Sequence, residues 1–284
     1  MDERHFFVVV NYNSGDSIIR CLHSILQSQH VHPLIVVVDN ASSDQSLELC
    51  KLKYPNLIYI YNTQNVGFAT AANIGTRYAL ERNATTITYC NPDATLSKDC
   101  ASLLTTAVTD NIVAIASPLI FDTTRKKQWF SGGKINFFTC QNTHAEPIKD
   151  LTQKVVSSEY ISGCVMTVHA SVYKKIGLFD ERFFLYYEDA DFCLRAKKEG
   201  FSLGLLPHAK AFHDEVSENH KEIKTYFLVL SGLLFFDKHA HGLARIWFHI
   251  HFFLRKIKNY YAQKKFHPYA SSVHKAFVDY ESLT

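Results

Sequence analysis

Short apolar runs alternate with helical patterns in the first part of the chain. The runs cover residues 6–10, 34–38, 57–61, 86–90 and 112–116. Between them, apolar positions three or four residues apart predict a helix over 18–26, and the alanine-rich segment 69–80 predicts another. Buried strands that do not alternate, joined by helices, are typical of a parallel sheet covered on both faces. The pattern therefore predicts an α/β fold.

Polar residues follow several of these strands directly. Asn11, Asp39, Asn62 and Asp93 each come at or just after the end of an apolar run. In such sheets ligands bind beyond the carboxyl ends of the strands. We expect these four side chains to converge on one crevice.

The second half of the chain is less regular. Residues 121–160 predict loop or short hairpin material over the sheet, and 163–169 predicts a strand leading to a helix over 171–176. A late strand is expected over 203–206, ending at Pro207-His208. Long helices are expected after residue 215.

Three carboxylates lie close together in residues 185–195, where Glu188, Asp189 and Asp191 begin an amphipathic helix. Like charges raise one another's pKa, and a carboxyl group held in this way can act as a general base near neutral pH. The other interpretation is structural. Acids stabilise the first turn of a helix, and Asp191 can pair with Arg195 one turn later.

Three further motifs each have a functional and a structural interpretation. Asp39 can accept from a base N–H or a ribose hydroxyl, or it can cap the next helix. Gly67 would let the backbone approach a ligand, with Asn73 pointing back from the following helix. In Asn91-Pro92-Asp93, the acid can hold a divalent cation that bridges a diphosphate, or the turn can simply cap a helix.

The order of these motifs along the chain resembles that of family 2 glycosyltransferases. The likeness is nearest to the bacterial rhamnosyltransferase-like branch that builds surface polysaccharides, and it spans roughly residues 6–215. The motifs are Val-Asp-Asn-Ala-Ser-Ser-Asp at 38–44, Asn-Val-Gly-Phe-Ala at 65–69, Asn-Pro-Asp-Ala at 91–94, Gly-Leu-Phe-Asp-Glu at 177–181 and Tyr-Glu-Asp-Ala-Asp-Phe-Cys-Leu-Arg at 187–195. The resemblance implies a GT-A fold, a nucleotide-sugar donor (a dTDP- or UDP-sugar), Mn²⁺ or Mg²⁺, and transfer with inversion.

The resemblance also implies roles for single residues in the chemistry. Asp93 corresponds to the surviving metal ligand of an Asp-x-Asp motif in which Asn91 replaces the first acid. His213 would complete the metal site, with His208 as the alternative. Asp189 corresponds to the general base that deprotonates the acceptor hydroxyl.

Glu188 is the second candidate for the base, and Asp191 is expected to orient Arg195. Asp39 corresponds to the nucleobase-binding acid. We expect the donor site to be completed by Asn11, Asn40, Asn65, Gly67 and Asn73.

Two domains are expected: a GT-A catalytic domain over 1–215, with donor binding in 1–120 and the acceptor and base region in 121–215, and a helical region over 216–284. Residues 223–261 carry an apolar, aromatic stripe with a basic flank. That pattern suits a helix lying on the inner-membrane surface. It equally suits packing against the catalytic domain or against a second subunit in a homo-oligomer.

Composition narrows the partners and the compartment. A formal charge of +3 gives no support for a nucleic-acid partner. Seven scattered cysteines and a charged N-terminus without a signal peptide predict a cytoplasmic protein, free or held peripherally on the inner membrane. The longest apolar run, 226–236, is too short to span a bilayer. The expected partners are a nucleotide sugar and a saccharide or lipid-linked glycan acceptor.

Two other function classes remain. A sugar nucleotidyltransferase needs a glycine-rich, basic loop after the first strand, and residues 11–16 contain neither lysine nor arginine. A non-catalytic nucleotide-binding subunit of a glycan assembly complex would bind nucleotide yet be indifferent to Asp189→Ala.

Overall fold

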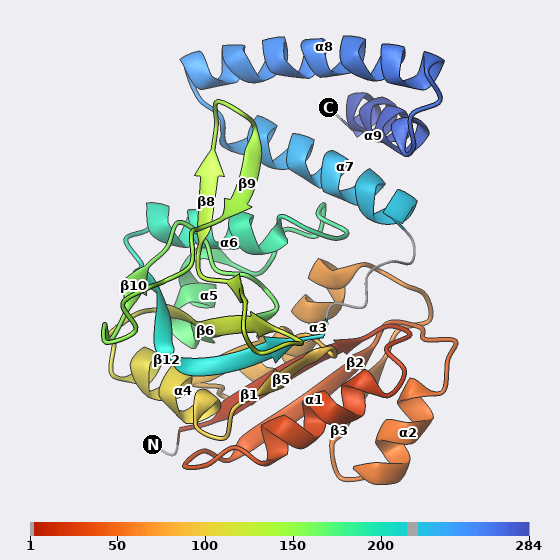
Figure 1. The fold of residues 1–284 in the computed structure, drawn as a ribbon. Coiled ribbons are helices and arrows are strands. Elements are labelled where there is room, and N and C mark those ends of the chain that lie inside the picture. The colour runs from red at the N-terminus through yellow and green to blue at the C-terminus, as the bar shows by residue number, and fades with distance from the viewer. Residues whose placement is uncertain (1–2, 215–220, 284) are drawn as a thin grey trace.

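The computed structural model describes residues 3–214 and 221–283, and its centre is a ten-stranded sheet (Figure 1). The order along the sheet is β10-β12-β6-β11-β4-β1-β2-β3, with β5 paired to β12 and β7 paired to β6. The strands are β1 (His5–Asn11), β2 (Pro33–Asp39), β3 (Ile58–Tyr61), β4 (Thr86–Cys90), β5 (Ala94–Leu96), β6 (Ile115–Asp122), β7 (Gln128–Phe130), β10 (Val156–Ser157), β11 (Val165–His169) and β12 (Leu203–His213).

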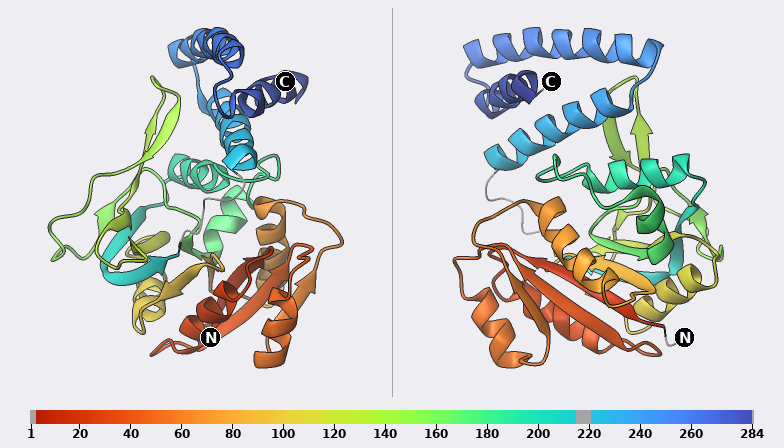
Figure 2. Two further views of the ribbon diagram at one scale, coloured as in Figure 1. Left: turned by 45° about the vertical axis from the view of Figure 1, so that its right-hand side comes forward. Right: turned by 180° about the vertical axis from the view of Figure 1, so that it is seen from behind.

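The predicted α/β class is confirmed. Parallel pairing joins β3, β2, β1 and β4, and it also joins β6 to β12, whereas β11 lies antiparallel between β4 and β6. Helices α1 and α2 cover one face of the β1–β3 region and α3 covers the other (Figures 1 and 2). The helices are α1 (Ser17–Leu26), α2 (Ser46–Lys53), α3 (Phe68–Leu80), α4 (Cys100–Thr109), α5 (Ala170–Ile176), α6 (Glu188–Lys198), α7 (Lys221–His239), α8 (Leu243–Lys264) and α9 (Ala270–Leu283).

The late strand is longer than the sequence pattern predicts. A strand over 203–206 that ends at Pro207 is wrong, because β12 continues to His213. A register shift between Leu206 and Lys210 accommodates Pro207, which has no N–H for the ladder, and pairing with β6 then resumes. The strand expected over 112–116 likewise begins later, at Ile115, and β5 and α4 are elements that the pattern did not predict.

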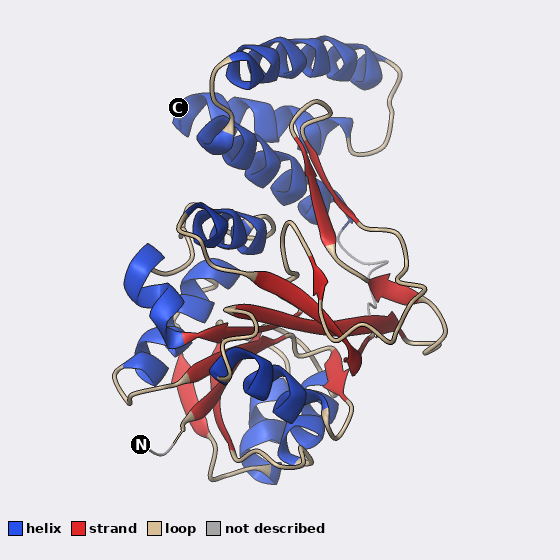
Figure 3. Ribbon diagram, turned by 90° about the vertical axis from the view of Figure 1, so that its left-hand side faces the viewer, coloured by secondary structure: helices blue, strands red, loops and turns tan. Residues whose placement is uncertain are grey.

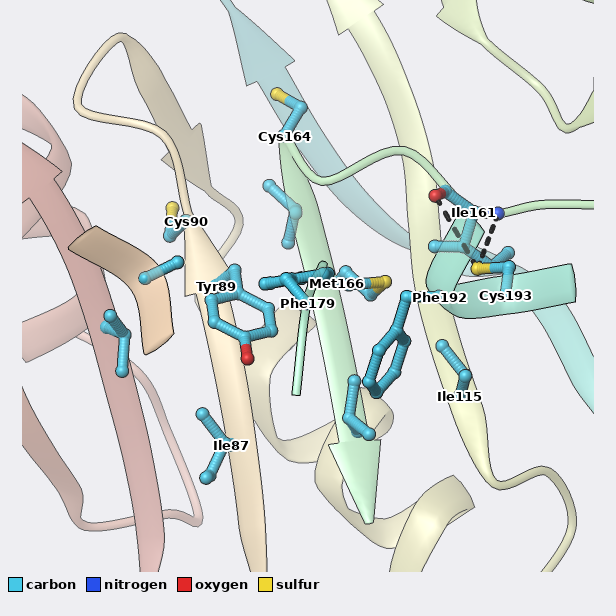
Figure 4. Packing of buried hydrophobic residues seen from close by; sticks show 14 of the residues in the cluster. Ile87, Tyr89, Cys90, Ile115, Ile161, Cys164, Met166, Phe179, Phe192 and Cys193 are labelled. Carbon is cyan, nitrogen blue, oxygen red and sulfur yellow. Dashed lines mark hydrogen bonds between the residues drawn. The ribbon is translucent and has the colours of Figure 1, made fainter. Parts of the chain in front are cut away.

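Large apolar side chains fill the space between β4, β11 and α6 (Figure 4). Tyr89, Phe179 and Phe192 form a row of buried rings, with centroids 4.9 Å and 5.0 Å apart, and Met166 packs among them. The core therefore fixes α6, which carries the acidic cluster, against the middle of the sheet.

A separate hairpin rises from the sheet toward the C-terminal helices (Figure 3). Its strands are β8 (Gly133–Asn136) and β9 (Gln141–His144), within the segment where a short hairpin is expected. At its tip, Phe137 packs against Phe236 of α7, and Phe138 stacks on Trp247 of α8 with ring centroids 5.0 Å apart. The long helices expected after residue 215 are α7, α8 and α9. The predicted domain boundary at 215/216 falls in residues 215–220, outside the described part of the chain.

Helix α3 lies close to the sheet because it presents small residues to it. Ala72, Gly75 and Ala79 are buried on this face, and a Cβ at Gly75 would lie 2.5 Å from Val8 Cγ1 of β1. Valine is stiff at χ1, so its methyl group has little freedom to move aside.

We predict that Gly75→Ala destabilises the protein by about 1–2 kcal/mol, although alanine is the better helix former by about 1 kcal/mol. Urea denaturation measures the loss. The double variant Gly75→Ala with Val8→Ala should lose less stability than the sum of the losses in the two single variants, because the smaller residue at position 8 removes the clash. Increased stability of Gly75→Ala alone would contradict the close packing.

Candidate active site

The carboxyl end of β2 holds a buried carboxylate. Asp39 is only 4% exposed; its Oδ1 accepts from Asn11 Nδ2 at 2.7 Å, and its Oδ2 accepts from the backbone N–H of Ser42 at 3.1 Å. Asn11 and Asp39 are directly paired residues of β1 and β2. A carboxylate offers about four acceptor positions, so two are left for a ligand.

A chain of amides continues from Asp39 across the strand ends. Asn40 donates to Asn65 Oδ1 at 2.7 Å and accepts from Asn62 Nδ2 at 3.0 Å, and Gly67 N–H donates to Asn65 at 3.0 Å. The structure thus brings together most of the residues expected in the donor site. The sequence interpretation of Gly67 changes, because its missing Cβ makes room for Phe184, whose carbonyl oxygen would lie 2.6 Å from that atom.

Asn73 has a different use from the one expected. Its Nδ2 donates to the carbonyl of Phe179 and to Glu181 Oε1, and its Oδ1 accepts from the N–H of Phe179. The side chain is buried. Asn73 therefore ties α3 to the segment that precedes the acidic cluster, and both of its N–H groups are already in use within the protein.

Asp93 and His213 meet because β5 pairs with β12. His213 lies opposite Ala94 in that pairing, and its Nε2 is 3.2 Å from Asp93 Oδ1. In the described part of the chain, Asp93 Oδ1 and His213 Nδ1 are buried and have no hydrogen-bond partner. The ring of Trp129 covers His213, with centroids 4.4 Å apart.

This pair fits a divalent cation. A spacing of about 3 Å is what two neighbouring ligands show around one octahedral cation, and an orphaned carboxylate oxygen is costly without a cation or donor. Over residues 3–214 and 221–283, no group of three or more His, Cys, Asp or Glu residues could hold a metal. A cation held by this pair needs further oxygen ligands, which the donor phosphates and water can supply.

His208, the alternative metal ligand, lies elsewhere. It sits in the irregular part of β12, five residues before His213, and lines a cavity of about 360 Å³ together with His30 and Lys154. The structure does not bring it to Asp93.

The two candidate bases at the start of α6 differ in their surroundings. Asp189 Oδ2 accepts from the N–H of Gly163 at 2.8 Å, and its Oδ1 accepts from the N–H of Ala190 at 2.7 Å. Burial raises the pKa of Asp189, and these N–H groups limit the rise. For Glu188, burial and the neighbouring Asp189 charge raise the pKa well above its ordinary value, and its Oε2 has no partner in the described chain.

One short segment connects the turn that carries Asp93 to the acidic cluster at the start of α6. Cys164 accepts at its carbonyl from the N–H of Asn91 at 2.8 Å, while Gly163 donates its N–H to Asp189. The turn that carries Asp93 and the first turn of α6 are therefore fixed to adjacent residues of the same backbone. Neither Gly163 nor Trp129 was identified from the sequence, because the contacts that matter come from pairing between distant segments.

Asp191 is fully buried and serves as an ionic centre behind the crevice. The pair expected with Arg195 forms, at 2.8 Å from Asp191 Oδ2. Oδ1 lies 2.5 Å from Lys238 Nζ and 2.7 Å from His239 Nε2, both on α7. Arg195 also donates to the carbonyls of Ile176 and Leu178. Asp191 thus joins α6 to α7, a role that only the tertiary structure reveals for Lys238 and His239.

The architecture is that of the GT-A glycosyltransferases. The solved structure described as GalNAc-T7 with UDP, GalNAc and Mn²⁺ superposes with a TM-score of 0.65 at 16% identity, over 94% of this chain and 58% of that one. This chain therefore spans little more than half the length of that protein. At this identity the likeness establishes the fold.

The chain belongs to glycosyltransferase family 2. The Glycosyl transferase family 2 profile matches residues 6–173. Among curated proteins, the low-salt glycan biosynthesis hexosyltransferase Agl10 of Haloferax volcanii is 28% identical over 78% of this chain and 71% of its own. The dTDP-rhamnosyl transferase RfbF of Shigella flexneri is 25% identical over 84% and 81%. The rhamnosyltransferase-like assignment and a role in glycan synthesis agree with these relatives.

We predict that Asp191→Ala destabilises the protein by about 3–5 kcal/mol, because it leaves the buried part of the cluster without its carboxylate: Arg195 loses its ion pair, and Lys238 keeps only Asp180. Chemical denaturation measures the loss, and Asp110→Ala at an exposed site should stay within about 0.5 kcal/mol of the parent. A loss as small as that of the control would show that the cluster does not hold α7.

The same carboxylate predicts a pH dependence of stability. Burial works to raise the pKa of Asp191, but the hydrogen bond from His239 and the charges of Arg195 and Lys238 hold it below its ordinary value. The contribution of Asp191 to the free energy of unfolding is therefore complete above the pKa of the unfolded state, about 4. It is lost as the pH falls through the lower pKa of the native state. Stability curves of the parent and Asp191→Ala should converge toward acid. A constant difference through that range would contradict this linkage.

Proposed function

We propose that the protein is a metal-dependent, inverting glycosyltransferase that moves a rhamnose or hexose unit from a nucleotide-diphosphate donor to a glycan acceptor. The observation that carries the proposal is the Gly163-Cys164 segment, which fixes the Asp93 turn and Asp189 to adjacent residues. An inverting displacement needs charge neutralisation at the leaving group and a base at the acceptor, held at a fixed separation.

Donor binding is assigned to the strand ends. Asp39 has acceptor positions free for a base N–H or a ribose hydroxyl. The amide of Asn11 donates to Asp39, and the amide of the neighbouring Asn40 donates to Asn65. Asp93 and His213 would hold Mn²⁺ or Mg²⁺ next to the diphosphate. When bound, the cation neutralises charge that develops on the departing nucleoside diphosphate.

Asp189 is the proposed base. Its raised pKa lies nearer to neutrality than that of an ordinary aspartate, which increases its basicity. For Glu188, burial and the neighbouring Asp189 charge raise the pKa well above its ordinary value, which favours the protonated form and makes this residue the second candidate for the base. A single displacement requires no covalent nucleophile, so Asp189 needs only to take the proton from the acceptor hydroxyl.

The donor and acceptor classes follow from the relatives and the crevice. RfbF is named for dTDP-rhamnose, and the GalNAc-T7 structure is described with UDP, so a dTDP- or UDP-sugar is proposed. A saccharide or lipid-linked glycan is the proposed acceptor, used on the cytoplasmic side.

A nucleotidyltransferase is disfavoured by the turn after β1. The N–H of Gly15 donates to Asp44 Oδ2 at 2.8 Å, so a carboxylate already occupies this position, where such an enzyme would bind phosphate. The non-catalytic nucleotide-binding alternative predicts no change in activity when the proposed base is removed.

We predict that one of UDP, dTDP, GDP and CMP raises the melting temperature in a manganese-dependent way. A ligand at a hundred times its Kd stabilises by about 2.7 kcal/mol, which a thermal melt detects readily. Asp93→Asn and His213→Ala should each abolish the manganese-dependent part, whereas His208→Ala should keep it. If no nucleotide stabilises the protein, or if His208→Ala alone removes the effect, the donor-site assignment fails.

We predict that Asp189→Asn lowers kcat by about 10²–10⁴-fold while nucleotide stabilisation is retained. Glu188→Gln resembles the protonated form that burial favours at this position and should cost less than about tenfold in kcat. In the parent, kcat/KM should fall toward acid at a pH above the ordinary aspartate pKa, since the base must be deprotonated. Full activity of Asp189→Asn would remove the base and favour the non-catalytic alternative.

A further inference from the structure

Helix α8 carries an exposed apolar stripe on the side that faces away from the rest of the described chain. The helix runs across the end of the molecule remote from the sheet (Figures 1 and 2). Its inner face packs on α9 through Phe252 against Phe277 and Phe248 against Tyr280. Its outer residues include Leu243, Ile246, Ile250, Phe253, Leu254, Ile257, Tyr260 and Tyr261, all between 41% and 85% exposed.

These outer residues form one continuous strip. Steps of three, four and seven residues along a helix return to the same face, so the strip follows the whole axis. A helix of 22 residues is about 33 Å long at 1.5 Å per residue. Continuous apolar patches of this size on a protein surface are sites of interaction.

The charged side chains of α8 itself are all of one sign. Residues 238–278 contain eight lysines and arginines and neither aspartate nor glutamate. Lys258 and Lys265 are exposed and have no ion pair within the described residues, and Lys264 lies over the Tyr260 ring at 4.5 Å. The nearby carboxylates come from other segments, where Glu281 pairs with Lys256 at 2.6 Å.

We infer that the outer face of α8 docks on an anionic phospholipid surface, with the helix lying in the plane of the interface. Apolar and aromatic side chains flanked by lysines are the features that bind such a surface. In the described residues, no helix is long and apolar enough to cross a membrane, which agrees with a helix lying flat. A second copy of this chain fits less well, because a two-fold contact along α8 would place cations against cations with no carboxylate on the helix.

Docking would also orient the catalytic half. Helix α7, which packs against α8 and α9, is bound to α6 through His239 and Asp191, and Ser231 donates to the carbonyl of Leu185 at 2.7 Å. The acceptor side is therefore linked to α7 by buried polar contacts, and through the packing of α7 to the membrane-facing helix. This orientation depends on the proposed function, whereas the docking itself does not.

Co-sedimentation of the full chain with vesicles tests the inference. Wild type should sediment with phosphatidylcholine vesicles containing about 30% phosphatidylglycerol, bind pure phosphatidylcholine weakly, and be released by high salt. The double variant Ile250→Glu with Phe253→Glu should lose at least about tenfold in partition coefficient. Lys258→Glu with Lys265→Glu should lose the preference for anionic vesicles.

Leu52→Glu is the matched control, because Leu52 is 83% exposed on α2, and this variant should bind as wild type does. Equal binding of the stripe variant and wild type, or no binding of wild type to either vesicle, would overturn the inference. So would a wild-type dimer in sedimentation velocity that the stripe variant dissociates. Unchanged nucleotide stabilisation in the stripe variant would show that it is folded and would separate this test from that of the donor site.

Discussion

The buried carboxylate of Asp191 is the constraint on which the placement of the site depends. A fully buried charge is costly unless its partners are in position, and those partners come from α6 itself and from α7. Arg195 also donates to the carbonyls of Ile176 and Leu178 and so holds the segment that leads into α6 against that helix. Helix α6 therefore has one position relative to its neighbours, and the residues of its first turn are fixed against the backbone at Gly163.

A short backbone segment links α6 to the other residues of the proposed chemistry. Gly163 binds Asp189, and Cys164 binds the turn that carries Asp93. Asp189, the proposed base, and Asp93, proposed to hold a cation with His213, are therefore held by neighbouring residues of one backbone segment rather than on separate loops. Positioning of this kind supplies much of the rate enhancement in a displacement that forms no covalent intermediate with the enzyme.

The sequence predicted those parts of the fold and site that local patterns encode. Continuous apolar runs identified β1, β2 and β4, and the polar residues after them identified the amide network around Asp39. Strand direction is not a local property, so the strand β11 was predicted but its antiparallel direction was not. Pro207 suggested an end to β12, but a shift in register accommodates it, and only the pairing of β12 with β5 places His213 beside Asp93. Asn73 and Gly67 were expected in the donor site, whereas the structure shows Asn73 bonded to Phe179 and Gly67 packed closely against Phe184.

The anomeric configuration of the product tests the central claim most directly. Proton NMR of the first turnovers, with the nucleotide sugar whose nucleotide the protein binds, reports that configuration before any later exchange. One displacement assisted by Asp189 predicts a product inverted relative to the donor. A retained configuration would contradict the account, because it requires either two displacements or a front-face reaction for which the base is not needed.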